Sequence, residues 1–150
     1  MPSYSIVCPD ANFVVNGLRQ AGQYETEIAA QWVALARDQT RLLAPTLLFF
    51  EVTNVFYQLE RSGKISSDES SRLLEIAMLI PFEFVDHPAL HRDALDIARE
   101  FGQKAAYDAH YVAVARRQHI PLITSDRRLL NVATDGFIDI VYIPFVNVYE

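Results

Sequence analysis

The stretch YSIVCPD (4–10) decides which fold this chain is expected to adopt. Its apolar run YSIVC (4–8) predicts a buried strand, and Pro9 biases the residue before it toward extended backbone. Asp10 follows at once, ahead of a short helix predicted over 11–18. Ligand sites of parallel α/β sheets lie outside the carboxyl ends of the strands, so Asp10 is expected at that edge.

The rest of the chain alternates short apolar runs with helical segments, which is typical of an α/β domain with a mostly parallel sheet. Further strands are predicted over 41–45, 82–86, 121–124 and 139–143. Helices are predicted over 24–39, 46–61, 66–80, 88–101, 106–118 and 126–132. The expected order is therefore β-α-α-β-α-α-β-α-α-β-α-β.

Length and composition indicate one globular domain over 1–150. No apolar run approaches the ~18 residues of a membrane span. The N-terminal sequence has neither the basic start nor the apolar core of a signal peptide. Cys8 is the single cysteine, which excludes a disulfide within the chain. We therefore expect a cytoplasmic protein that does not associate with membranes.

The net charge of −6 argues against a general nucleic-acid binder, which usually carries a basic surface. The objection weakens if several acids together hold divalent cations, because the ions cancel part of that charge. Arg116, Arg117, Arg127 and Arg128 are candidates for the rim of such a site. A solvated helix surface is the alternative explanation for these arginines.

Four carboxylates interrupt or directly follow apolar stretches: Asp10, Glu51 in TLLFFEVTNVF (46–56), Asp108 in AAYDAHYVAVA (105–115) and Asp126 at the end of IPLITSD (120–126). A carboxylate in apolar surroundings costs free energy unless a positive group compensates it. No Lys or Arg lies within three residues of the first three acids. If the fold gathers all four, they predict a site for Mg²⁺ or Mn²⁺, which prefer oxygen ligands, and hence metal-assisted phosphodiester chemistry.

Each acid also has a simpler explanation. Asp10 and Asp126 would serve as caps of the helices that follow them. Asp108 would complement the dipole in the first turn of its helix. Glu51 would belong, with Asn54, to a solvated polar stripe along one helix face.

Polar neighbours of two of these acids are candidates for supporting roles. Asn12 is expected as a polar partner or water holder beside Asp10. Thr124 and Ser125 supply hydroxyl groups that would orient Asp126 or a water molecule on the metal.

Together these motifs resemble the PIN domain family, specifically the VapC-like toxin ribonucleases of type II toxin–antitoxin systems. The matching pieces are a first strand ending in Asp10, E-x-x-N as Glu51 to Asn54, Y-D-A-x-Y-x-A-x-A as Tyr107 to Ala115, and L-x-T-x-D-x-x-L as Leu122 to Leu129. The four acids of the family fall on Asp10, Glu51, Asp108 and Asp126 in the same order, and the match spans nearly the whole chain.

The resemblance implies a Rossmann-like three-layer fold with a mostly parallel sheet of about five strands. It implies an Mg²⁺- or Mn²⁺-dependent endoribonuclease for single-stranded RNA, in which the four acids bind metal and Thr124 orients them. Metal-activated water would attack the phosphorus in line and release the 3′-oxygen. It also implies a homodimer and an antitoxin protein that blocks the site.

Two other kinds of function stay open at this point. One is an inert PIN-like module that binds RNA or a partner protein, which the acidic net charge favours. The other is a metal-dependent phosphatase or DNA nuclease on a similar sheet, since the four acids do not distinguish RNA from DNA.

Overall fold

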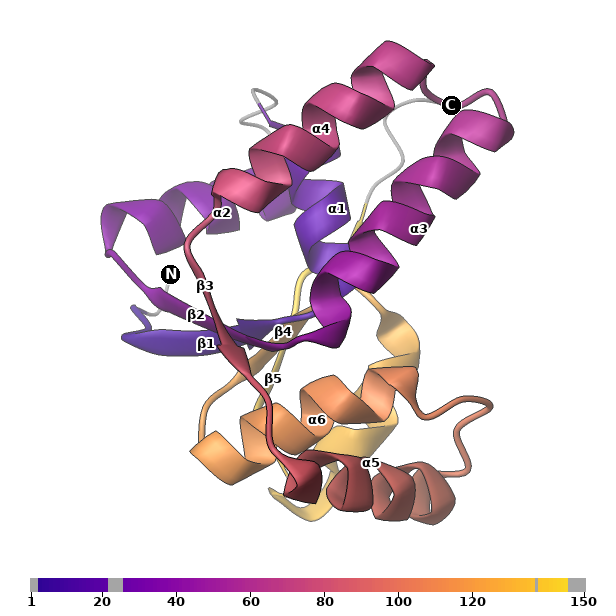
Figure 1. The fold of residues 1–150 in the computed structure, drawn as a ribbon. Helices are drawn as coiled ribbons and strands as arrows, with labels where there is room; N and C mark the ends of the chain where they lie inside the picture. The colour runs from indigo at the N-terminus through magenta and orange to yellow at the C-terminus, as the bar shows by residue number, and fades with distance from the viewer. Residues whose placement is uncertain (1–2, 22–25, 137, 146–150) are drawn as a thin grey trace.

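A parallel sheet forms the middle layer of the molecule in the computed structural model, which describes residues 3–21, 26–136 and 138–145 (Figure 1). The strand order is β3-β2-β1-β4-β5, and every neighbouring pair is parallel. The strands are β1 (Ile6–Pro9), β2 (Arg41–Pro45), β3 (Phe82–Val85), β4 (Leu122–Thr124) and β5 (Ile140–Tyr142). The predicted α/β fold with a five-stranded parallel sheet is confirmed.

Helices cover both faces of this sheet. In Figure 1, α1 (Ala11–Arg19), α2 (Glu27–Arg37), α3 (Leu47–Arg61) and α4 (Ser67–Leu79) lie above it. Below it lie α5 (Pro88–Phe101) and α6 (Tyr107–Gln118). The three layers and the element order agree with the sequence prediction.

The segment after β4 differs from the prediction. Instead of an α-helix over 126–132, it forms the longer 3₁₀ helix η1 (Arg127–Gly136). The helix predicted over 24–39 is shorter, Glu27–Arg37, and the start of the predicted range lies outside the described residues.

Local signals in the sequence explain where several helices begin and end. Helix α5 has Pro88 at its first position, and Gly102 with a φ of 62° follows its end, where a residue without Cβ adopts left-handed backbone at little cost. The Ser66 hydroxyl accepts the Glu69 N–H (3.1 Å) at the start of α4. These caps hold the helices in register with the strands they connect.

Helix α6 packs between the sheet and α5 (Figure 1). Five consecutive residues, Tyr111 to Ala115, are buried on it, so no face of this part of α6 is left to solvent. This packing fixes the first turn of α6, and with it Asp108, near the carboxyl ends of the central strands. No helix among the described residues is long and apolar enough to cross a membrane.

Candidate active site

Strand pairing brings Asp10 beside Thr124 although the two are far apart in sequence. Strands β1 and β4 are parallel neighbours, and the Asp10 N–H donates to the Ile123 carbonyl (3.0 Å). The Thr124 hydroxyl donates to one carboxylate oxygen of Asp10, and the Phe13 N–H donates to the other (2.8 Å). Asp10 therefore caps α1, which was the alternative role predicted from the sequence. In the same position it faces the edge of the sheet.

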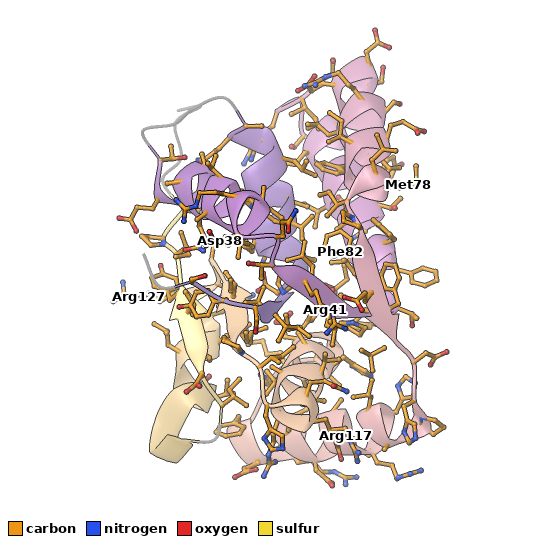
Figure 2. The ribbon with its side chains drawn as sticks, turned by 90° about the vertical axis from the view of Figure 1, so that its left-hand side faces the viewer. Asp38, Arg41, Met78, Phe82, Arg117 and Arg127 are labelled. Atoms are coloured by element: carbon orange, nitrogen blue, oxygen red, sulfur yellow. The ribbon has the colours of Figure 1, made fainter. Side chains whose placement is uncertain are left out.

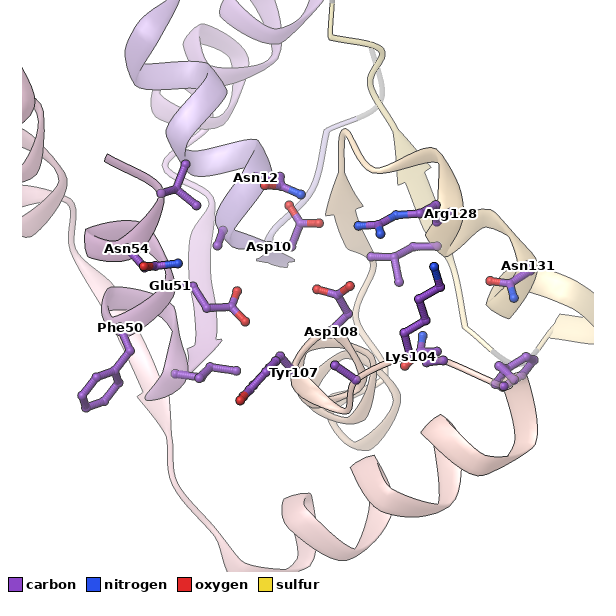
Figure 3. Close-up of a pocket in the computed structure, with 18 residues that line it drawn as sticks. Asp10, Asn12, Phe50, Glu51, Asn54, Lys104, Tyr107, Asp108, Arg128 and Asn131 are labelled. Atoms are coloured by element: carbon purple, nitrogen blue, oxygen red, sulfur yellow. The ribbon is translucent and has the colours of Figure 1, made fainter. Parts of the chain in front are cut away.

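A hollow of about 750 Å³ opens at this edge, beyond the carboxyl ends of the strands. Asp10, Glu51 and Asp108 line it, and Figure 3 shows their carboxylates directed toward one another. They come from the start of α1, the first half of α3 and the first turn of α6. Three of the four predicted acids thus share one pocket. We call it the carboxylate pocket.

The fourth acid, Asp126, is not among the described residues that line this pocket. Its side chain is 8% exposed and is bound by the Arg128 guanidinium (2.7 Å). Its carboxylate also accepts the Arg128 N–H (2.9 Å), as a cap of η1 does, and its own N–H donates to the Thr124 hydroxyl (2.9 Å). The hydrogen bonds and charge of Arg128 hold the pKa of Asp126 below its usual range.

The three acids in the pocket are in the opposite electrostatic state. Burial raises the pKa of Asp10 to about 7, and repulsion from Asp108 and Asp126 adds to the shift. Burial likewise raises the pKa of Glu51 to about 7, with a further contribution from Asp108. The pKa of Asp108 is also raised, by burial and by Asp126, although Arg128 opposes the shift. Each negative charge here is therefore unfavourable until something positive joins it.

Tyr111 is a site residue that the sequence analysis missed. Its buried hydroxyl donates to Glu51 Oε2 (3.1 Å) and so links α6 to α3. Burial and the nearby Glu51 charge raise the pKa of Tyr111, so it remains a hydrogen-bond donor. Its position three residues after Asp108, on the same helix face, is the signal that would have identified it.

The predicted supporting residues divide into two groups. Asn12 and Asn54 line the carboxylate pocket, whereas Ser125 does not. The Ser125 hydroxyl instead accepts a hydrogen bond from the Asn16 side chain (3.0 Å), another residue that the sequence analysis missed. Thr124 contacts both Asp10 and the Asp126 backbone, so it connects the pocket acid with Asp126.

Two basic side chains line the pocket, Arg128 and Lys104, and Figure 3 shows both on the side opposite Glu51. Arg128 was one of the four arginines proposed for the rim. Lys104, in the loop before α6, was missed. Arg117 instead pairs with Asp93 on the outer surface (Figure 2), and Arg116 and Arg127 are not among the described residues that line the pocket.

The donor set suits a hard divalent cation, because carboxylate and amide oxygens face one space and the carboxylates repel one another. Within the described residues, however, no three His, Cys, Asp or Glu side chains stand close enough together to hold an ion as they are placed. An ion bound here would draw the carboxylates inward. Metal binding by these residues therefore stays a prediction.

Comparisons with known proteins agree with this geometry. The model of the PIN domain family matches residues 7–135. No curated protein sequence is similar enough to count as a match. Among solved structures, PAE2754 from Pyrobaculum aerophilum is 29% identical, with a TM-score of 0.60 over 89% of this chain and 91% of that chain.

Two more distant structures share the fold. VapBC2 from Rickettsia felis, bound to a DNA fragment from its promoter, is 13% identical, with a TM-score of 0.64 over 92% of this chain and 98% of that chain. VapBC-5 from Mycobacterium tuberculosis, a member of the VapBC family of toxin–antitoxin systems, is 14% identical, with a TM-score of 0.60 over 93% and 99%.

Proposed function

Because this chain belongs to the PIN domain family, a family of nucleases, we propose that it is a metal-dependent endoribonuclease that cleaves single-stranded RNA. One observation carries the proposal. Asp10, Glu51 and Asp108 face one another at the ligand edge of the sheet, and the pKa of each is raised. Such perturbed acids are typical of functional sites rather than of sites that stabilise a fold.

Asp10, Glu51 and Asp108 would hold Mg²⁺ or Mn²⁺, and Asp126 is linked to Asp10 through the Thr124 hydroxyl. When bound, the ion would supply a Lewis acid that activates water and offsets charge on the phosphate. Hydrolysis that breaks the bond from phosphorus to the 3′-oxygen leaves a 5′-phosphate and a 3′-hydroxyl end.

The chain's own side chains position the acids for this reaction. Hydrogen bonds from Thr124 and from the Phe13 N–H fix both carboxylate oxygens of Asp10. The Tyr111 hydroxyl holds Oε2 of Glu51 and leaves Oε1 for the ion or a water molecule. These donors orient the acids before any ligand arrives, which lowers the cost of assembling the site.

Arg128 and Lys104 would bind the phosphates of RNA on the other side of the pocket. Both line it, and Arg128 is 79% exposed although it pairs with Asp126. Positive groups beside a set of acids allow a chain of net charge −6 to hold a polyanion locally.

We further propose that the protein is the toxin of a toxin–antitoxin pair, acts in the cytoplasm and forms a homodimer. Two structures with the same fold are VapBC toxin–antitoxin proteins, which supports an antitoxin partner. An inert module that binds RNA or a partner is the second candidate, favoured by the net charge of −6.

The deciding experiment is cleavage of labelled single-stranded RNA by the purified protein, freed of any partner, in Mg²⁺, in Mn²⁺ and in EDTA. We expect cleavage that requires metal and is lost in Asp108→Asn. The matched control is Asp96→Asn, since Asp96 is a 77% exposed acid on α5. Metal-independent cleavage, or equal loss in both variants, would contradict the proposal. A protein that binds RNA but cleaves no RNA in any condition would support the inert module.

A further inference from the structure

A second hollow of about 340 Å³ adjoins the carboxylate pocket and has no part in the function proposed above. The two share Leu47, Phe50 and Tyr107 as a common wall. Its other lining residues are the apolar Pro45, Val85 and Leu90 and the polar Thr46, Asp86, His87, His91 and His110. Its volume lies at the lower end of the ~300–1,000 Å³ usual for small-ligand pockets. We call it the side pocket.

Two aromatic rings on the common wall are exposed without a structural reason. Phe50 is 74% exposed and Tyr107 is 62% exposed. The neighbouring Phe49 instead packs its ring against Phe82 and Phe84, at centroid distances of 5.9 and 5.4 Å. Figure 3 shows the Phe50 and Tyr107 rings directed away from the three carboxylates. They stand where a ligand that leaves the carboxylate pocket would meet them.

Three histidine rings, with Asp86 and Thr46, form the polar part of the side pocket. His110 Nδ1 lies 2.7 Å from the Ala106 carbonyl oxygen, which only accepts, so this nitrogen donates. His110 Nε2 lies 3.0 Å from Nδ1 of His91. His87 Nδ1 accepts the Ala89 N–H (3.0 Å). With these atoms occupied, Nε2 of His87 and Nε2 of His91 are the ring nitrogens left for a ligand.

We propose that the side pocket is a subsite for one unpaired nucleobase of the RNA, next to the phosphodiester that is cut. The inference rests on the proposed function in taking RNA as the ligand. Unpaired bases are recognised by stacking on aromatic side chains and by hydrogen bonds along their edges. Phe50 and Tyr107 supply the rings, and His87 and His91 supply polar groups.

The geometry favours a base over a protein side chain as the occupant. Leu47, Phe50 and Tyr107 line both hollows, so a nucleotide in the side pocket would lie next to the expected phosphate and be tethered to its neighbour in the RNA. Apolar side chains and histidine rings line the side pocket together, a combination that suits a flat ring with a polar edge.

The test is an abasic scan of a short single-stranded RNA, made with Asp108→Asn protein in Mg²⁺ so that binding is measured without cleavage. Each nucleotide in turn loses its base, and affinity is measured by fluorescence anisotropy. We expect one position at which base removal weakens binding about tenfold, the scale of one stacked base. When Phe50→Ala is combined with Asp108→Asn, we expect base removal at that position to have no effect on affinity.

Tyr57→Ala is the matched control, because Tyr57 is another exposed aromatic residue of α3 (52%) and lines neither hollow. It is expected to leave the abasic effect intact. His91→Ala tests the polar end and is expected to change which base is preferred at the same position. Circular dichroism confirms that each variant is folded.

The outcomes separate this inference from the proposed function. No base-dependent position, or an effect that survives Phe50→Ala, overturns the side pocket as a subsite. Pocket variants that alter only self-association or binding of a partner protein overturn it in favour of a protein interface. Metal-dependent cleavage of bis(p-nitrophenyl) phosphate, which has no base, is measured in parallel with the original Asp108 protein. Absence of that activity, with base-dependent RNA binding intact, would overturn the nuclease proposal and leave the side pocket as a base-binding site only.

Discussion

The pKa of a paired acid on the outer surface is lowered, whereas the pKa values of the acids in the carboxylate pocket are raised. Glu83 on the surface is bound by Arg41 (2.7 Å), and this partner lowers its pKa. Asp10 and Glu51 in the pocket have pKa values raised to about 7, chiefly by burial. The negative charge of a surface acid is solvated or paired, so it costs the folded state little free energy. The pocket acids are placed where charge is unfavourable, so function and not stability accounts for them.

The largest test of this contrast is Asp10→Asn. The amide keeps an oxygen to accept the Phe13 N–H but removes the charge that would hold metal. We expect metal-dependent RNA cleavage to fall by about 1,000-fold, because a bound ion contributes several kcal/mol to the transition state. Single-turnover rates in saturating Mn²⁺ measure the loss. Activity within tenfold of the original protein would show that Asp10 is not a ligand.

The second test is the pH dependence of stability without metal. Unfolded carboxyls of Asp10 and Glu51 ionise near 3.8 and 4.5, whereas the folded groups ionise at about 7. Between these values the folded state holds more protons than the unfolded state, so these two acids make stability fall as pH rises from about 4 to about 7. At about 1.4 kcal/mol for each pKa unit, the shift of Asp10 from 3.8 to about 7 corresponds to on the order of 4 kcal/mol.

Urea unfolding in EDTA, across this pH range, measures the effect as the difference between the original protein and Asp10→Asn. Subtracting the variant removes the opposite contribution of surface acids whose pKa is lowered. Addition of Mg²⁺ above pH 7 should restore the lost stability in the original protein alone. If the difference in unfolding free energy between the two proteins does not change with pH, the Asp10 carboxyl is exposed to water in solution and its pKa is not raised.

The third test concerns Arg128, which lies between an acid with a lowered pKa, Asp126, and one with a raised pKa, Asp108. Arg128 pairs with Asp126 and also opposes the raised pKa of Asp108. Arg128→Ala is expected to tighten Mn²⁺ binding by about threefold to tenfold, because a positive charge beside the carboxylates is removed. Calorimetric titration measures the dissociation constant. Arg127→Ala is the control, since Arg127 is exposed and does not line the pocket. Equal changes in Mn²⁺ affinity in both variants would mean that the net charge of the protein, and not the position of Arg128, causes the effect.

The smallest expected effect is that of Arg41→Ala on the outer surface. Its ion pair with Glu83 is solvent-exposed, and such pairs contribute little. Melting temperature and RNA cleavage should both stay within experimental error. A clear loss of melting temperature or of RNA cleavage would show that the surface acid Glu83 contributes to stability or function, contrary to the contrast made here.

Elements with local signals could be predicted from the sequence. Strand Arg41–Pro45 and helix Pro88–Phe101 match their predicted bounds, because proline and glycine mark the strand's end and both ends of the helix. The positions of Asp10 and Asp126 just beyond strands followed from the same local patterns. A helical pattern over 126–132 was misleading, since 3₁₀ and α-helical turns share similar spacing.

Contacts between distant segments could not be predicted. The pairing of β1 with β4 places Thr124 on Asp10, and the placement of α3 and α6 on the two faces of the sheet brings Tyr111 within hydrogen-bond distance of Glu51. Both depend on tertiary arrangement, which no single window of sequence specifies. The same holds for the side pocket, whose wall joins the start of α3 to residues of α5 and α6.

The packing around Trp32 gives the protein an internal optical probe. Trp32 is the single tryptophan, and its ring stacks on Phe13 at 5.0 Å, in space that Gly17 leaves open. Its indole N–H donates to the Phe13 carbonyl (3.2 Å), and the Phe13 N–H donates to Asp10. Two hydrogen bonds therefore connect the fluorophore to the carboxylate pocket. Tryptophan emission reports on the first turn of α1, so occupancy of the pocket can be followed in solution without any label.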